Sequence, residues 1–108
     1  MSTAQAVQEI FSAMPGRLNP QAAQGLDCTI QYDLTGDGGG QYHSKIKDGA
    51  AEVNQGPAAS PNMTITMAAQ DFVDMTSGKL DGMSAFMSGK LRISGDMGLA
   101  MKLQSLFR

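Results

Sequence analysis

The chain has 108 residues, of which 42% are hydrophobic and 17% charged, with eight Lys and Arg against ten Asp and Glu. This composition excludes a disordered chain, and the scatter of the few basic residues excludes the basic stripe of a nucleic-acid-binding surface. A chain of this length can bury a core of its own, which predicts one domain over residues 1–108.

The single cysteine, Cys28, excludes an internal disulfide, and no basic and apolar leader opens the sequence. No apolar run approaches the roughly 20 residues that a membrane-spanning helix needs. A reducing compartment is the default for such a chain, so we expect a cytoplasmic location.

The first predicted element is a helix over residues 4–14, where apolar side chains recur at helical spacing. We expect it to end at Pro15, because proline disrupts a helix interior. Asn19 is then a suitable cap for a short helical turn that begins at Pro20.

Alternation of apolar and polar residues predicts five strands. The pattern is clearest over 26–34, and four further segments follow it: 41–47, 51–54, 63–67 and 90–94. The glycine-rich run 36–40 and the pair Asp48-Gly49 are predicted to be hairpin connections.

Each predicted strand has one apolar and one polar face, so helices are expected to cover one side of the sheet and leave the other wet. The sequence therefore predicts a two-layer α+β domain with a five-stranded, mostly antiparallel sheet. Its first three strands are expected to form an antiparallel meander.

Three helices are predicted in the last third of the chain. They are expected over 69–76, from 82 through 87, and from 97 onward. Asp81 and Asp96 are the expected N-caps of the second and third. The apolar stripe of the third helix consists of Leu99, Leu103 and Leu106, widened by Met97, Met101 and Phe107.

The tetrapeptide Ser-Gly-Lys-Leu occurs twice, at 77–80 and at 88–91. Glycine is the residue that most often ends a helix, because it adopts the left-handed conformation freely. We interpret the two copies as the same stop signal at the ends of two short helices.

Side chains that perform catalysis are sparse. His43 is predicted on the polar face of the sheet and Cys28 on the apolar face, so the two cannot form a nucleophile–base pair or supply a metal site. Asp71 and Asp74 lie one helical turn apart, where the helix dipole accounts for them. We therefore expect no enzyme, no cofactor and no metal.

Methionine is unusually frequent: seven of the nine methionines follow residue 60. Its flexible thioether fills irregular space and adapts to varied contacts. On composition alone, a loosely packed core and the wall of an apolar binding site are both consistent with this enrichment.

Several short runs after residue 62 are specific. They are Met63-Thr64-Ile65-Thr66-Met67, Asp71-Phe72, Ser84-Ala85-Phe86, Gly89-Lys90-Leu91 and Met97-Gly98-Leu99-Ala100-Met101-Lys102-Leu103-Gln104. In these residues the chain resembles the sterol carrier protein 2 (SCP2) family. The resemblance implies helices over one face of a five-stranded sheet, a hydrophobic tunnel between the layers, and non-catalytic binding and carriage of a sterol, phospholipid, fatty acid or fatty acyl-CoA.

Two departures limit what the resemblance implies. Met87 and Ser88 stand where animal members carry an aromatic residue and Gln, so sterol specificity is not carried over. The chain also ends without the Ser-Lys-Leu-like signal of peroxisomal relatives, which favours a free-standing, bacterial-type domain.

The tunnel lining is expected from apolar residues of the last third, with ordinary core packing as the alternative for each. We expect Phe72, Met75, Met83, Phe86, Met87, Met97, Met101 and Leu103, with Leu106 and Phe107 near the exit. The cations of this region are expected to be solvated, with contact to an acyl-CoA phosphate or a lipid head group as the alternative: Lys79, Lys90, Arg92 and Lys102.

The sequence thus favours a lipid or acyl-CoA carrier that meets a membrane surface or a lipid-pathway enzyme transiently and binds no nucleic acid. The alternative is an accessory module that presents a hydrophobic intermediate to such an enzyme, or docks on it through the final helix.

Overall fold

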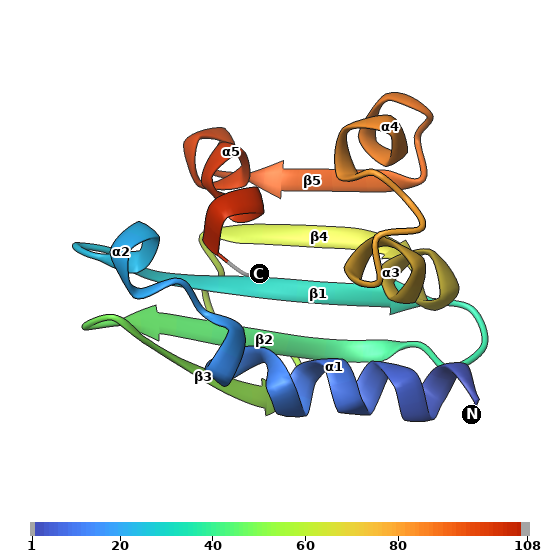
Figure 1. Ribbon diagram of the computed structural model, residues 1–108, viewed down its shortest axis with the longest axis horizontal. Coiled ribbons are helices and arrows are strands. Elements are labelled where there is room, and N and C mark those ends of the chain that lie inside the picture. Colours follow the sequence, from blue (N-terminus) through green and yellow to red (C-terminus); the bar gives the residue numbers. More distant parts are fainter. Residues whose placement is uncertain (1, 107–108) are drawn as a thin grey trace.

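The computed structural model describes residues 2–106, with the backbone alone for residues 103 and 104. Five helices and five strands follow one another along the chain (Figure 1): α1 (Thr3–Arg17), α2 (Pro20–Ala23), β1 (Asp27–Thr35), β2 (Gly40–Lys47), β3 (Ala50–Gln55), β4 (Met63–Ala68), α3 (Ala69–Thr76), α4 (Gly82–Met87), β5 (Leu91–Gly95) and α5 (Met97–Leu106). The predicted α+β class and the five-stranded sheet are confirmed.

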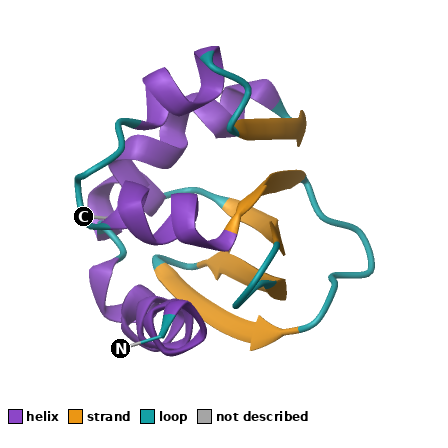
Figure 2. Cartoon of the chain, turned by 90° about the vertical axis from the view of Figure 1, so that its right-hand side faces the viewer, coloured by secondary structure: helices purple, strands orange, loops and turns teal. Residues whose placement is uncertain are grey.

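The helices all lie on one side of the sheet, so the domain has two layers (Figure 2). The strand order is β3-β2-β1-β4-β5, and every neighbouring pair is antiparallel except β1 and β4. The expected meander of β1, β2 and β3 is present, and its second hairpin turns between the paired residues Lys47 and Ala50.

β3 lies at one edge of the sheet and β4 lies beyond β2 and β1, so the chain must pass over these two strands between β3 and β4. Segment 56–62 makes this crossing over the outer face. The amide N–H of Ala58 donates to Oε1 of Gln31 at 3.0 Å, and Nδ1 of His43 lies 2.8 Å from the carbonyl oxygen of Gly56. The prediction of a solvent-exposed outer face is therefore wrong at Gln31, which this segment buries.

Helix α1 packs along the sheet through Val7, Phe11 and Met14, and Leu18 directly after it is also buried. The predicted end at Pro15 is wrong, because the helix continues to Arg17 with Pro15 inside it. A proline in the last turn removes one backbone hydrogen bond, while the continued turn carries the chain on to the buried Leu18.

An aromatic cluster fills the core under α1. The Phe11 ring stacks on Tyr42 at a centroid distance of 4.2 Å and on Phe72 at 5.3 Å, and it meets Tyr32 edge to face at 5.2 Å. Rings in these geometries attract one another beyond the effect of buried area alone. The cluster fastens α1 and α3 to strands β1 and β2.

The two Ser-Gly-Lys-Leu copies have the same conformation, which confirms the interpretation of a shared stop signal. Ser77 and Ser88 are the C-caps of α3 and α4, and Gly78 and Gly89 follow them with φ of 86° and 82°. In both copies the lysine N–H donates to the carbonyl oxygen five residues earlier, at 2.8 and 2.9 Å, as in a Schellman motif. Helix α4 therefore lies between two matching turns.

Candidate functional site

A cavity of about 730 Å³ lies between the helix layer and the sheet. The sheet forms its floor through Tyr32, Ile65, Leu91 and Ile93, and four helices form its walls. In Figure 1 α4 and α5 lie toward opposite ends of β5, with α3 below α4 and α1 across the lower strands. The wall residues are Ile10, Met14, Arg17, Phe72, Met75, Thr76, Gly78, Leu80, Asp81, Gly82, Met83, Phe86, Met97, Ala100 and Met101.

The structure brings six of the ten expected lining residues together around this cavity. They are Phe72, Met75, Met83, Phe86, Met97 and Met101. Phe72 is buried, whereas Met83, Phe86, Met97 and Met101 are 44–83% exposed and form the cavity mouth. Their role in binding a lipid remains a prediction.

The other four expected residues lie elsewhere or outside the description. Met87 does not line the cavity and is 80% exposed, because it lies on the outer side of α4. Leu106 is fully buried, and its carbonyl oxygen accepts from the N–H of Asn19 at 2.7 Å, so it belongs to the core. The side chain of Leu103 and the whole of Phe107 lie outside the described residues.

The expectation missed the contribution of α1. Ile10, Met14 and Arg17 are spaced i, i+4 and i+7, so they form one stripe on the helix. Met14 is shared with the neighbouring core stripe of Val7 and Phe11. The stripe that lines the cavity was visible in the sequence, but the packing of α1 against α3 was not.

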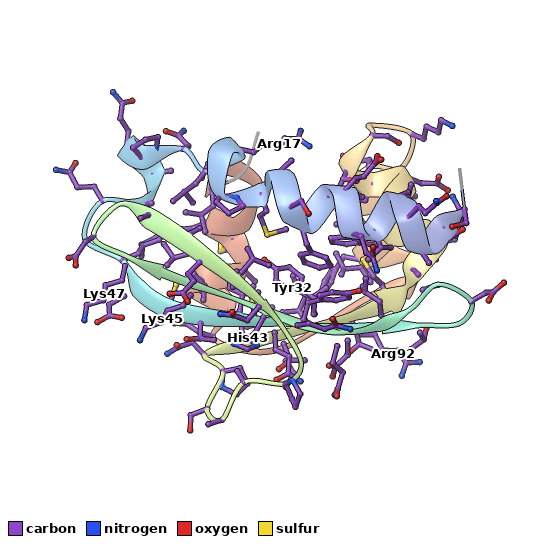
Figure 3. All side chains as sticks on the ribbon, turned by 90° about the horizontal axis from the view of Figure 1, so that it is seen from below. Arg17, Tyr32, His43, Lys45, Lys47 and Arg92 are labelled. Carbon is purple, nitrogen blue, oxygen red and sulfur yellow. The ribbon has the colours of Figure 1, made fainter. Side chains whose placement is uncertain are left out.

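The charged groups at the cavity are few. Arg17, in the last turn of α1, is the basic residue of the described lining, and Asp81 is the acidic one. Asp81 caps α4 as predicted: its Oδ2 accepts from the backbone N–H of Ser84 at 3.0 Å and from its hydroxyl at 3.2 Å. In Figure 3 Arg17 extends from the helix layer, away from the sheet.

The floor holds one polar pair. Tyr32 lies between α1 and the sheet (Figure 3), with its hydroxyl 3.0 Å from Oγ of Ser44 and 3.7 Å from Sδ of Met14. Burial raises the pKa of Tyr32 well above its ordinary value, and the hydrogen bond with Ser44 only partly offsets this. The phenol therefore stays neutral and hydrogen-bonded in the core.

The remaining reactive side chains do not converge. Burial, reinforced by Asp27, raises the pKa of the Cys28 thiol, which therefore stays protonated. His43 is engaged with Gly56 on the outer face. Within residues 2–106 no three His, Cys, Asp or Glu side chains are grouped so that they could hold a metal ion. Of the helices described, none is both long and apolar enough to span a bilayer.

A second hollow, of about 540 Å³, lies on the exposed face of α1. Five side chains of this one helix line it: Gln5, Gln8, Glu9, Ser12 and Ala13. One helix face cannot enclose a ligand, so this hollow is no competing site.

Comparison with protein families and known proteins supports one assignment. The model of the SCP-2 sterol transfer family matches residues 5–108. The hydroxysteroid dehydrogenase-like protein 2 of Rattus norvegicus is 37% identical over 102 residues, which cover 94% of this chain and 20% of that protein. The chain thus spans about a fifth of the length of this relative.

Two solved structures cover nearly the whole chain. The crystal structure of sterol carrier protein 2 like 2 from Aedes aegypti is 27% identical, with a TM-score of 0.77, and the match covers 94% of this chain and 93% of that one. The solution structure of palmitated SCP2L2 from the same organism is 28% identical, with a TM-score of 0.74 over 95% and 91% of the two chains.

Proposed function

The chain belongs to the SCP-2 sterol transfer family, and on that premise we propose that it binds and carries a lipid, without transforming it, in the cavity between its two layers. The observation that carries the proposal is the cavity of about 730 Å³, whose floor and walls are predominantly apolar. This volume lies in the usual range for small-molecule sites, roughly 300–1,000 Å³.

The energetics favour a long hydrocarbon chain. Each buried methylene contributes about 0.8 kcal/mol, which gives about 13 kcal/mol for a chain of roughly 16 carbons. Association and ordering cost about 4–15 kcal/mol. The difference is compatible with micromolar binding, which is tight enough to hold a lipid and weak enough to release it.

Within the lipids we propose a single-chain ligand with an acidic head group, such as a fatty acid or fatty acyl-CoA. Arg17 is available for that head group, whereas Oδ2 of the acidic lining residue, Asp81, is engaged by Ser84. The palmitated state of the Aedes aegypti relative supports this choice. The family description names sterols, so a sterol is the competitor to test against.

Titration of the purified, delipidated protein with a fluorescent fatty acid tests the proposal. Saturable binding, competition by palmitate and a rise in Tm with palmitate are expected, since a ligand that binds only the folded state stabilises it. Native mass spectrometry of the protein as purified should show bound lipid. An unchanged Tm together with no saturable binding of any fatty acid or sterol would remove the proposal.

The relatives favour a second candidate role. In the hydroxysteroid dehydrogenase-like protein 2 of Rattus norvegicus the matched region is 20% of a longer protein, so the same cavity would present a hydrophobic intermediate to an enzyme. A carrier should accelerate transfer of a fluorescent fatty acid between vesicles in proportion to its concentration. A presenting module should bind the fatty acid and leave that transfer rate unchanged.

A further inference from the structure

The large apolar side chains that the described structure leaves exposed are confined to α4 and α5. We call them the apolar rim: Met83, Phe86, Met87, Met97 and Met101. Four of them line the cavity, and the fifth, Met87, faces solvent on the outer side of α4. A cluster of exposed apolar side chains is typical of an interaction surface, whereas single exposed apolar residues are common on any protein.

Basic side chains accompany the rim. Lys79 precedes Met83 by four residues and Lys90 follows Met87 by three, and both lysines are exposed. Lys102 is exposed as well, but it follows Met101 directly on α5, so its side chain points to another side of the helix. Arg92 does not join them, because it points away from the helices on the outer face of the sheet (Figure 3).

The acidic residues are distributed in the opposite way. Residues 77–106 contain four Lys and Arg against two Asp and Glu, whereas residues 2–76 contain three against eight. Both acids of the C-terminal third cap helices: Asp81 accepts from Ser84 N–H at 3.0 Å, and Asp96 accepts from Leu99 N–H at 3.2 Å. The net charge of −2 is therefore unevenly distributed: the C-terminal third is basic, and it carries the large apolar side chains that are exposed among the described residues.

We propose that the apolar rim docks the protein on an anionic lipid bilayer, with the cavity mouth facing the membrane. Thioethers and the Phe86 ring would enter between the head groups, and Lys79 and Lys90 would meet lipid phosphates and carboxylates. Apolar side chains flanked by lysines are the composition of surfaces that lie in a membrane interface. The purpose of docking, which is to bring the cavity to the membrane, rests on the proposed function. The docking surface is argued from the rim and its lysines alone.

Charge favours a bilayer over a second copy of the chain. A two-fold dimer through the rim would bring the lysines of the two copies near one another, and like charges across an interface oppose association. An anionic membrane removes that repulsion and provides apolar surroundings for the methionines.

Flotation with phosphatidylcholine vesicles, with and without phosphatidylserine, tests the proposal. We expect binding to the anionic vesicles only, weakened by high salt. The variant Lys79→Gln/Lys90→Gln should bind about 25-fold more weakly, at about fivefold for each lysine. Met87→Ser should lose about fivefold, and Met87 lies outside the cavity lining.

The matched control is Lys45→Gln/Lys47→Gln. It removes the same charge from exposed lysines of β2, on the side of the sheet away from α4 (Figure 3). Its vesicle binding should stay within about twofold of the parent, because screening weakens charges more than a Debye length from the membrane. Equal losses in the two lysine pairs would overturn the proposal in favour of unspecific attraction.

A parallel fatty acid titration separates this inference from the proposed function. Lys79→Gln/Lys90→Gln and Met87→Ser should retain fatty acid affinity and Tm. If the parent binds fatty acid but floats with no vesicle, the docking surface is wrong and the carrier function stands. If the parent floats with anionic vesicles but binds no lipid in solution, the docking surface stands and the carrier function is wrong. A dimer in sedimentation velocity that Met87→Ser dissociates would assign the rim to a second copy.

Discussion

The hydroxyl oxygen of Tyr32 and Oγ of Ser44 lie 3.0 Å apart, and both side chains are buried beneath the cavity. They come from neighbouring strands: Tyr32 pairs with Tyr42 and Ser44 with Ile30 in the register of β1 and β2. The surroundings are apolar, so each hydroxyl depends on the other for its hydrogen bond, apart from the long contact with Sδ of Met14.

Removing one member of this pair should therefore cost more than removing both. Tyr32→Phe leaves the Ser44 hydroxyl buried without its partner, which we expect to lower the free energy of unfolding by about 1–3 kcal/mol. Tyr32→Phe/Ser44→Ala removes both polar groups and should recover most of that loss. Urea unfolding of the two single variants and the double variant measures the coupling. Additive losses would show that the hydrogen bond contributes nothing.

Stability should fall at alkaline pH. Burial raises the pKa values of Tyr32 and Cys28, so the neutral form of each is favoured in the folded state. Their stabilising contribution is complete below the unfolded pKa values, about 8.5 for Cys and about 10 for Tyr, and is lost as the pH rises above them.

The urea midpoint should thus decline from about pH 8.5 upward and more steeply above about pH 10. Cys28→Ala should remove the first part of the decline and Tyr32→Phe the second. If the urea midpoint of the variant Cys28→Ala/Tyr32→Phe declines with pH as much as that of the parent, this assignment is wrong.

Filling the cavity should abolish lipid binding without unfolding the protein. Ala100 lies in the cavity wall on α5, so Ala100→Trp would occupy space that a ligand chain needs. We expect fatty acid affinity to fall by at least about 100-fold, since several methylenes lose their site at about 0.8 kcal/mol each. The control is Ala13→Trp, on the exposed face of α1, which should bind as the parent does.

Arg17 should distinguish head groups. If a carboxylate meets its guanidinium, Arg17→Gln should weaken fatty acid binding by about fivefold, as for an exposed ion pair of up to about 1 kcal/mol. The matching fatty alcohol has no charge, and its affinity should not change. Isothermal titration calorimetry with both ligands provides the comparison, and equal losses would place the head group elsewhere.

Gly95, at the end of β5, should tolerate no side chain. Its φ is 104°, and an added Cβ would collide with the carbonyl oxygen of Asn62. Gly89 shares the positive φ but has open space around it. Gly89→Ala should cost about 1 kcal/mol, and Gly95→Ala at least about 2 kcal/mol more. Equal Tm losses in the two variants would show that the backbone near Asn62 yields.

The sequence predicted the local structure well because local rules govern it. Alternation located all five strands, and the caps Asp81 and Asp96 and both Ser-Gly-Lys-Leu turns lie where they were expected. The errors arose where distant segments meet. Pro15 stays helical because the buried Leu18 follows the turn that contains it, and Gln31 is buried by a segment that is more than 20 residues away in sequence.

The candidate site was half predictable for the same reason. The methionines and phenylalanines of α3, α4 and α5 follow from composition, but Ile10, Met14 and Arg17 join them only through the packing of the helix layer. Periodicity also could not distinguish the inner from the outer side of a helix as short as α4. Met87 was therefore placed with Met83 and Phe86, although it faces solvent.

Helix α4 buries only Ala85 of its six residues, and a Schellman motif lies at each of its flanks. The space beneath it is therefore a portion of hydrophobic core that the polypeptide itself does not complete. A bound hydrocarbon chain would complete it, so cargo occupancy and the protection of α4 amides from hydrogen exchange would be two measures of a single equilibrium.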